Sequence, residues 1–318
     1  MSKRKFLIDV DTGIDDSIAL LYILNQPEIE VVGITTSCGN VDAYQAAENT
    51  LRIIKLSKCA YEVPVIIGAN QPLEGEWGGT VAFIHGHNGV GDVDLPVSQQ
   101  KAVTNISAED YIYQMACKYE GELEVITLGR MTNLAQAILK YPDLIKKIKK
   151  VVAMGGTLKV SGNVSPVGEA NFAGDPKSCD IVFMSGLDVL VVGLDVTMKV
   201  RLKLSKVMEV APYVSDKYKE AFAYMVDALK YYMTGNRIQD YCIDECPLHD
   251  PLTMMVAVNP SLVSVEYKKA RMECEGTYCK GMVVTDMRVH PFDANYIGFA
   301  MDVDSEKALN ELFSVFWK

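Results

Sequence analysis

Four aspartates stand close together near the start of the chain, in the segment Asp9-Val-Asp11-Thr-Gly-Ile-Asp15-Asp16. Carboxylates packed this closely repel one another, and capping of a following helix would account for only one or two of them. Clustered carboxylate and carbonyl oxygens are the ligands that hard divalent cations prefer in proteins. The segment therefore favours a bound divalent cation.

A second polar segment, Leu248-His249-Asp250-Pro251, joins an imidazole to a carboxylate far along the chain. The ordinary pKa of histidine lies near neutrality, so His249 is a candidate acid, with a structural histidine bonded to a carbonyl as the alternative. The eight cysteines are scattered, without the paired C-x-x-C spacing and accompanying histidines of zinc sites. Reduced core thiols are therefore favoured over disulfides or zinc.

The elements that must position these residues alternate between short apolar runs and helical patterns. Strands are expected at 5–10, 30–36, 64–67, 123–128, 151–154 and 189–193, and helices at 15–25, 43–56, 108–118, 132–140, 205–233 and 305–316. Two short strands at 262–267 and 282–285 are expected to be antiparallel. Because continuous apolar strands are typical of sheets covered on both faces, the sequence predicts an α/β fold. The expected sheet is open, mostly parallel and Rossmann-like, with helices on both faces and a few antiparallel strands toward the C-terminus.

Further polar segments follow the expected strands, at Cys38-Gly-Asn40 and Gly129-Arg-Met-Thr-Asn133. In an open parallel sheet the carboxyl ends of the strands line one crevice, where ligands bind. We therefore expect these segments to converge with the aspartates at 9–16. The chain shows no internal repeat and no linker-like change of composition, so residues 1–318 are expected to form a single domain.

Composition restricts the partners. Hydrophobic residues make up 49% of the chain, and 31 Lys and Arg against 41 Asp and Glu give a net charge of −10, which disfavours nucleic acid and anionic membranes as partners. No apolar run approaches the roughly 18 residues of a membrane span, and the first residues lack a signal-peptide pattern. A cytoplasmic protein with a small-molecule partner is expected.

The segment at 9–16 resembles the D-x-D-x-G-x-D-D signature of the inosine–uridine-preferring nucleoside hydrolase family. Other segments occur in that family's order: Gly39-Asn40, Gly129 to Ala135, Met154-Gly-Gly, Gly162-Asn163 with Glu169-Ala-Asn171, and Leu248 to Pro251. Each is weak alone, but their joint occurrence from residue 9 to about 251 is specific. The sequence departs from the family at Leu128, where Thr is frequent, and at Arg130, where Pro or a small residue is usual.

The resemblance implies a ribonucleoside N-glycosidase that holds one Ca²⁺ and releases ribose and a free purine or pyrimidine base. By position, the ion would be held by the side chains of Asp11, Asp16 and Asp250 and by the backbone carbonyl of Leu128. Asp11 would also be the general base, and His249 the acid that protonates the departing base. The implied ribose ligands are Asp15, Asn40, Asn163, Glu169 and Asn171, with turn or capping roles left open for Asn163 and Asn171.

Other implied positions are less specific. His85 lies in a glycine-rich segment that matches the family, where both a loop closing over the substrate and a solvated histidine remain open. Arg237 and Tyr241 precede His249 in the region where the family contacts the nucleobase. Tyr224, Tyr231 and Tyr232 are expected mainly to pack in the core, with contact to the base as the alternative. The resemblance also implies a homodimer or homotetramer.

Two other functions fit parts of the sequence. A haloacid dehalogenase-type phosphohydrolase uses a D-x-D-x-T loop, but the Thr here comes one place early and this reading leaves Leu248 to Pro251 without a role. A non-catalytic nucleoside-binding protein would need neither Asp11 as a base nor His249 as an acid. A nucleoside hydrolase is therefore the expected function, and its nucleobase preference stays open.

Overall fold

The computed structural model describes residues 3–240 and 243–317, and its centre is a nine-stranded sheet in the order β10-β9-β11-β6-β5-β4-β1-β2-β3. The strands from β11 to β3 are parallel, and β9 runs antiparallel to both β11 and β10. Their bounds are β1 (Arg4–Val10), β2 (Ile29–Thr36), β3 (Val65–Ile67), β4 (Leu123–Thr127), β5 (Ile148–Met154), β6 (Val189–Val192), β9 (Val263–Met272), β10 (Val283–Asp286) and β11 (Tyr296–Val303).

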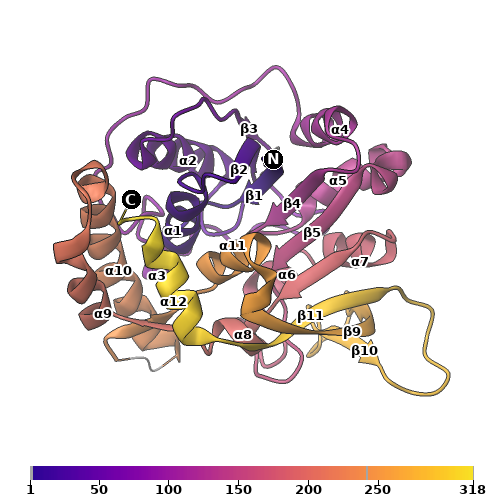
Figure 1. The fold of residues 1–318 in the computed structure, drawn as a ribbon. Helices are drawn as coiled ribbons and strands as arrows, with labels where there is room; N and C mark the ends of the chain where they lie inside the picture. Colours follow the sequence, from indigo (N-terminus) through magenta and orange to yellow (C-terminus); the bar gives the residue numbers. More distant parts are fainter. Residues whose placement is uncertain (1–2, 241–242, 318) are drawn as a thin grey trace.

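Helices cover both faces of this sheet (Figure 1). One face carries α1 (Ile14–Ile23), α2 (Ala43–Ser57), α10 (Lys219–Asp240), α11 (Asp250–Val258) and α12 (Ser305–Ser314). The other carries α4 (Ala108–Lys118), α5 (Thr132–Lys140) and α7 (Pro176–Met184). Within β1, Phe6 and Ile8 pack with the first group and Leu7 packs with the second. The strands read as continuous apolar runs because successive side chains enter two separate cores.

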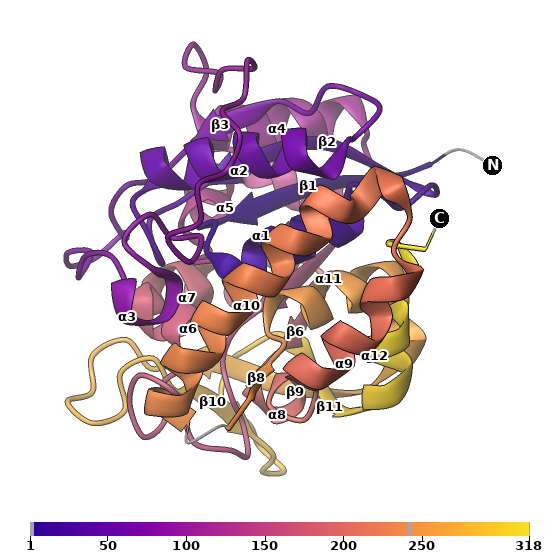
Figure 2. The same ribbon diagram turned by 90° about the vertical axis from the view of Figure 1, so that its left-hand side faces the viewer.

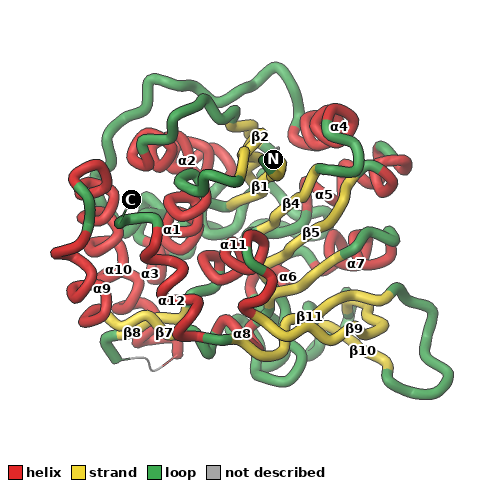
Figure 3. Tube along the Cα trace, in the orientation of Figure 1, coloured by secondary structure: helices red, strands yellow, loops and turns green. Residues whose placement is uncertain are grey.

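Short elements complete the chain, and the tube view shows β7 and β8 apart from the strands of the main sheet (Figure 3). Strands β7 (Arg201–Lys203) and β8 (Glu245–Pro247) pair antiparallel outside the main sheet. The remaining bounds are α3 (Ala82–His85), α6 (Ala170–Gly174), α8 (Leu194–Thr197), α9 (Leu204–Val210) and the 3-10 turns η1 (Pro142–Lys146), η2 (Ala211–Tyr213), η3 (Asp216–Tyr218) and η4 (Pro260–Leu262). None of the helices in the described part of the chain is long and apolar enough to cross a membrane.

The predicted fold class is confirmed, but several elements differ from expectation, among them α7 and α11, which were not expected. The helix expected over 205–233 is divided, because Pro212 lies in η2 between α9 and the long helix α10, which continues to Asp240. Strand β11 was not expected, and it lies between β9 and β6, parallel to β6. The antiparallel part of the sheet therefore consists of β9 with its two neighbours.

The carboxyl ends of the parallel strands bring the polar segments together. Asp9 of β1 lies opposite Thr35 of β2 on one side and Thr127 of β4 on the other, so the loops that follow these strands are neighbours. Figure 2 shows α10 crossing in front of α1, with α3 near the end of α10. Helix α10 and α3 thus bring residues distant in sequence to the sheet edge that carries the aspartates.

Candidate active site

A cavity of about 540 Å³ opens at this edge of the sheet. Most of the residues that the sequence assigned to ribose, base or metal line it, namely Asp15, Asn40, His85, Leu128, Asn163, Glu169, Asn171, His249 and Asp250. Asp11 and Asp16 are buried and contact the lining residue Asn40. The structure therefore gathers, in one place, side chains that are spread over more than two hundred positions of the chain.

Three carboxylates form the acidic centre of the site. Oxygen atoms of Asp15, Asp16 and Asp250 lie within 4.8 Å of one another, and all three residues are buried. Asp15 and Asp16 belong to the first turn of α1, and Asp250 begins α11, so both helices direct their amino ends at the centre. The grouping contains Asp16 and Asp250 as the sequence predicted, and its third member is Asp15.

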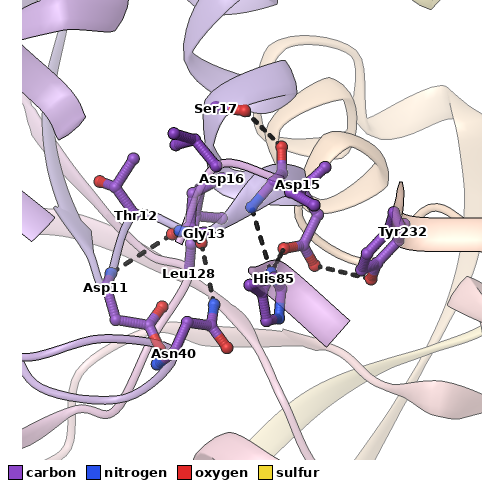
Figure 4. Close-up of polar contacts among 12 residues, drawn as sticks. Asp11, Thr12, Gly13, Asp15, Asp16, Ser17, Asn40, His85, Leu128 and Tyr232 are labelled. Atoms are coloured by element: carbon purple, nitrogen blue, oxygen red, sulfur yellow. Dashed lines mark hydrogen bonds and ion pairs between the residues drawn. The ribbon is translucent and has the colours of Figure 1, made fainter. Parts of the chain in front are cut away.

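Asp11 lies beside this centre and is held by backbone groups (Figure 4). Its Oδ2 accepts a hydrogen bond of 2.7 Å from the backbone N–H of Asn40, and its own N–H donates to Asp16 Oδ1 at 3.3 Å. Two glycines leave room for the Asp11 carboxylate, because a Cβ at Gly39 would overlap Oδ2 and one at Gly129 would lie 2.9 Å from Oδ1. The position of the Asp11 carboxylate thus depends on three separate loops.

Burial and mutual repulsion act together on these carboxylates. Burial, followed by the charge of Asp15, raises the pKa of Asp16 to about 7. Burial, followed by the charges of Asp15 and Asp16, raises the pKa of Asp250 well above its ordinary value. Asp15 Oδ1 is buried and has no hydrogen-bond partner among the described residues. These carboxylate oxygens are hard ligands that repel one another, and Asp15 Oδ1 has a lone pair that no described residue uses. Both features fit a divalent cation, whose charge would offset the repulsion.

The carbonyl of Leu128 and the amide of Asn171 meet at the edge of the cavity. Asn171 Nδ2 donates to the Leu128 carbonyl oxygen at 2.6 Å and, more weakly, to that of Met154 at 3.3 Å. The carbonyl predicted to bind the cation thus already accepts one hydrogen bond, and its second lone pair remains for another partner. Asn171 is consequently held by the carbonyl of Leu128, and it still lines the cavity.

Glu169 and Asn163 cap the short helix α6. Glu169 accepts from the N–H groups of Gly156, at 2.8 Å, and of Asn171, at 3.0 Å, and burial raises the pKa of Glu169 to about 7. Asn163 Oδ1 accepts from the N–H of Ala170 at 2.9 Å. The capping role left open for Asn163 is therefore present, and both side chains still line the cavity.

His85 is a buried member of the site. Its Nδ1 accepts a hydrogen bond of 3.1 Å from the N–H of Ile14 and lies 3.8 Å from Asp15 Oδ1. Burial lowers the pKa of His85 to about 3, so the ring is neutral at pH 7 and carries its proton on Nε2. The alternative of a solvated histidine is therefore wrong for His85, whereas the side chain of His87, two residues further on, is 87% exposed.

His249 lies against α8, where its Nδ1 is 2.9 Å from the hydroxyl of Thr197. Burial, followed by the charge of Arg201, lowers the pKa of His249 to about 3. The imidazole is therefore neutral at pH 7, which corrects the expectation of a pKa near neutrality. Thr197 had no signal in the sequence, because nothing in its neighbours indicates a contact across more than fifty positions.

Helix α10 supplies two lining residues that sequence reasoning missed, Asn236 and Gln239. Tyr232, for which contact with the base was left open, also lines the cavity, and its hydroxyl donates to Asp15 Oδ2 at 3.2 Å. Their spacing along one helix face was the available signal. The other tyrosines behave as expected of packing residues, since Tyr224 contacts Ser17 and Tyr231 donates to the carbonyl of Ala82.

Of the two predicted base contacts, one is not brought into the cavity and the other lies outside the described residues. Arg237 is exposed on α10 and is absent from the cavity lining, because it lies on the solvent side of the helix that carries Asn236 and Gln239. Tyr241 lies outside the described residues.

An open parallel sheet with carboxylates, amides and two histidines converging on one cavity defines an α/β enzyme for a small polar substrate. The family model described as inosine-uridine preferring nucleoside hydrolase matches residues 6–310, and the chain therefore belongs to this family. This confirms the family expected from the motifs and disfavours the phosphohydrolase and the non-catalytic binding protein.

Relatives and solved structures agree with that assignment. The chain is 34% identical over 299 residues to Uridine nucleosidase 1 of Arabidopsis thaliana, covering 93% of this chain and 87% of the relative. It is 31% identical over 281 residues to the pyrimidine-specific ribonucleoside hydrolase RihA of Escherichia coli, covering 88% of each. A plant nucleoside hydrolase, PpNRh1, matches with a TM-score of 0.91 and 34% identity, covering 98% of each chain. A purine-preferring ribonucleoside hydrolase from Gardnerella vaginalis matches with a TM-score of 0.90 and 34% identity, covering 99% of this chain and 98% of that one. The chain is a nucleoside hydrolase that acts on ribonucleosides.

Proposed function

We propose that the protein is a Ca²⁺-dependent hydrolase that cleaves the N-glycosidic bond of ribonucleosides and releases ribose and a free purine or pyrimidine base. The observation that carries this proposal is the buried trio of Asp15, Asp16 and Asp250, which lies beside a cavity lined by carboxylate and amide side chains that can hydrogen-bond ribose hydroxyls. We further propose that it serves purine and pyrimidine salvage in the cytoplasm as a homodimer or homotetramer. The net charge of −10 supports a small-molecule substrate and argues against a nucleic-acid or membrane partner.

The residues proposed to hold the ion supply only hard oxygen atoms. The family resemblance implies four ligands of the ion: the side chains of Asp11, Asp16 and Asp250 and the carbonyl of Leu128. Two of these residues, Asp16 and Asp250, also belong to the buried trio of carboxylates. Asp15 lines the cavity, whereas Asp16 does not, so we assign Asp15 to the ribose hydroxyls. When bound, the ion lowers the pKa of a coordinating water and anchors vicinal hydroxyls.

Asp11 is the proposed general base. The N–H of Asn40 occupies its Oδ2, which leaves Oδ1 to take a proton from the attacking water. As the water oxygen bonds to the anomeric carbon, the C–N bond breaks and its electron pair leaves with the nucleobase. The ring passes through an oxocarbenium-like state, which the negative charges of Asp15 and Glu169 beside the ribose stabilise, by analogy with glycoside hydrolysis.

His249 is the proposed donor to the departing base. If the Thr197 hydroxyl donates to Nδ1, the neutral ring carries its proton on Nε2 and donates a hydrogen bond from Nε2 to the leaving base, which takes up its own proton from water. His85, already fixed with its proton on Nε2, supplies a second hydrogen-bond donor to the cavity. The two rings therefore assist departure as neutral donors, with no stable imidazolium required.

Ribose release from inosine, uridine, cytidine and adenosine tests the proposal. We expect ribose to appear with Ca²⁺, to stop appearing after chelation, and to return when Ca²⁺ is added back. Full activity in chelator would contradict the Ca²⁺ requirement. Release of phosphate from nucleotides without ribose release, or binding of nucleosides without turnover, would contradict the hydrolase itself.

A further inference from the structure

The peptide group that joins Gly39 to Asn40 is held from two sides. Its N–H donates to Asp11 Oδ2 at 2.7 Å, and its carbonyl oxygen, which belongs to Gly39, accepts a hydrogen bond of 2.9 Å from the indole Nε1 of Trp77. A trans peptide is planar and directs its C=O and its N–H to opposite sides. The Trp77 indole and the Asp11 carboxylate therefore bind one rigid unit from opposite directions.

The chain alone does not fix the direction of this peptide. Gly39 has no Cβ, and a Cβ placed there would overlap Asp11 Oδ2, so only glycine allows the close approach. The same lack of a side chain gives Gly39 a wide range of backbone angles. A rotated peptide would turn its carbonyl oxygen toward Asp11, and two acceptors cannot form a hydrogen bond. The bond from Trp77 opposes that rotation because it holds the carbonyl on the far side.

The loop that carries Trp77 runs from β3 to α3 and is tied to the same turn by other bonds. The backbone N–H of Trp77 donates to Gln71 Oε1 at 2.8 Å, which fixes its place in the loop. The N–H of Val81, just before α3, donates to the Asn40 carbonyl at 2.9 Å. The Asn40 side chain is held separately, since its Nδ2 donates to Asp16 Oδ2 at 3.2 Å. Loss of the indole N–H would thus free the peptide without releasing the Asn40 side chain.

We infer that Trp77 is a positioning residue for the hydrolysis, because its indole N–H holds the Gly39–Asn40 peptide with the N–H toward Asp11 and so fixes the carboxylate whose Oδ1 receives the proton. The inference rests on the proposed role of Asp11 as the general base. A hydrogen bond to a carboxylate is stronger than a neutral one, and a second bond on the same peptide polarises it further. Trp77 does not line the cavity, so it acts through Asp11 and not on the substrate.

Removal of the indole N–H tests this role. Trp77→Phe keeps an aromatic ring and removes the donor. With saturating Ca²⁺ and the ribonucleoside that wild type hydrolyses fastest, we expect kcat to fall by about tenfold and KM to stay within about twofold of wild type. A role confined to holding the loop would instead raise KM, because the loop leads into α3 and the cavity-lining His85.

Trp317→Phe is the matched control for this variant. It makes the same change at the only other tryptophan of the chain, which is 48% exposed near the C-terminus and does not line the cavity. We expect it to leave both kcat and KM unchanged.

NMR spectroscopy observes the hydrogen bond directly in the wild-type protein with Ca²⁺ present. The two tryptophans give two indole N–H signals, which Trp317→Phe assigns. We expect the Trp77 indole N–H to exchange with solvent at least about tenfold more slowly than that of Trp317. In Trp77→Phe, the amide proton of Asn40 should move upfield, because its bond to Asp11 lengthens.

The outcomes separate this inference from the proposed function. Unchanged kcat in Trp77→Phe, or a change in KM alone, would overturn the inference while a loss of turnover in Asp11→Asn still supported the base. Near-normal kcat in Asp11→Asn would remove the proposed base, and the inference with it. Rapid exchange of the Trp77 indole N–H in wild type would overturn the inference without any variant. Should Trp77→Phe fail to fold, Gln71→Ala takes its place, since it releases the backbone of Trp77, and unchanged kcat there would overturn the inference.

Discussion

At their amino ends, β1 and β4 bury a carboxylate between two cations, whereas at their carboxyl ends the same strands lead into carboxylates that mostly face one another. Glu124 of β4 is 3% exposed, and its two oxygens lie 2.6 Å from Arg4 Nη2 and 3.0 Å from Lys149 Nζ. Burial alone would raise the pKa of Glu124, but the hydrogen bonds and charges of Arg4 and Lys149 hold it below the ordinary value.

The contrast shows what a purely structural carboxylate looks like in this fold. Where the chain only needs to bury negative charge, it supplies cations from neighbouring strands. In the acidic centre, burial and neighbouring aspartates instead raise the pKa of Asp16 to about 7. A protein keeps such an arrangement at a cost to its own stability, and that cost is explained if the carboxylates are held for an external cation.

The largest expected difference between the carboxylates at the two ends of these strands is in turnover. Asp11→Asn keeps the shape of the side chain but cannot accept a proton, so we expect kcat to fall by about 10²–10⁴-fold with Ca²⁺ still bound. Glu124→Gln removes a carboxylate that is equally buried and should leave kcat unchanged. Steady-state ribose release and calorimetric Ca²⁺ binding measure the two effects. Near-normal kcat in Asp11→Asn would assign the base role to another residue.

The leaving group isolates the role of His249. A hypoxanthine or uracil departs poorly as an anion, whereas a p-nitrophenolate needs no proton. If His249 is the donor, His249→Ala should slow hydrolysis of inosine or uridine on the order of 10²-fold and largely spare p-nitrophenyl riboside.

Thr197→Val tests the same role more narrowly, because it removes only the hydroxyl that contacts His249 Nδ1. We expect the rate of hydrolysis of inosine or uridine to fall by about tenfold or less, and that of p-nitrophenyl riboside to be largely unchanged. Equal losses of activity on both substrates would show instead that His249 acts through the metal site or the fold.

Stability should respond differently at the two ends of the strands. Glu124→Gln removes the negative charge that Arg4 and Lys149 share, and we expect it to lower the free energy of unfolding by about 1–3 kcal/mol, with or without Ca²⁺. Asp16→Asn should be destabilising only in the presence of Ca²⁺, by about 2–3 kcal/mol at an ion concentration one hundred times Kd, because bound ligand no longer stabilises the fold. Urea unfolding in chelator and in Ca²⁺ measures both effects. If Asp16→Asn lowered the free energy of unfolding equally in both conditions, Asp16 would behave as a structural carboxylate like Glu124.

Local patterns predicted the alternating strands and helices of an open, mostly parallel sheet and the convergence of polar segments at one of its edges. The aspartate segment follows β1, so the topology of an open sheet places it at the carboxyl edge. Leu248 to Pro251 follows β8 outside the main sheet and reaches the site because α11 packs against α1. The choice of Asp15 as the third member of the trio could not be read from spacing, because it depends on how the first turn of α1 faces α11.

Other features depend on tertiary burial. The neutral rings of His85 and His249 result from desolvation, which a sequence does not display. The glycine-rich neighbours of His85 indicate a loop and conceal the short helix α3. Strand β11 was missed although Tyr296–Val303 contains an apolar run, since Gly298 interrupts it.

The smallest expected effect concerns pH. In chelator, the folded-state pKa values of Asp16 and Glu169 are about 7, well above the ordinary values near 4, so the folded protein binds more protons than the unfolded chain between about pH 4 and 7. The carboxylates therefore make the free energy of unfolding fall as the pH rises through that window. His85 and His249 act in the opposite sense below about pH 6.5, because their folded-state pKa values of about 3 favour protonation of the unfolded chain.

Between pH 6.5 and 8 the carboxylates dominate, and we expect chelated protein to be more stable at pH 6.5 than at pH 8 by about 1 kcal/mol. Saturating Ca²⁺ should abolish or reverse this difference, because the ion stabilises the ionised carboxylates. Glu124→Gln should leave the pH dependence unchanged over this range, since the pKa of Glu124 is lowered and lies far below it. Thermal unfolding at the two pH values, with and without Ca²⁺, measures the effect. The same pH dependence in both conditions would mean that the acidic centre does not exchange its protons for a cation.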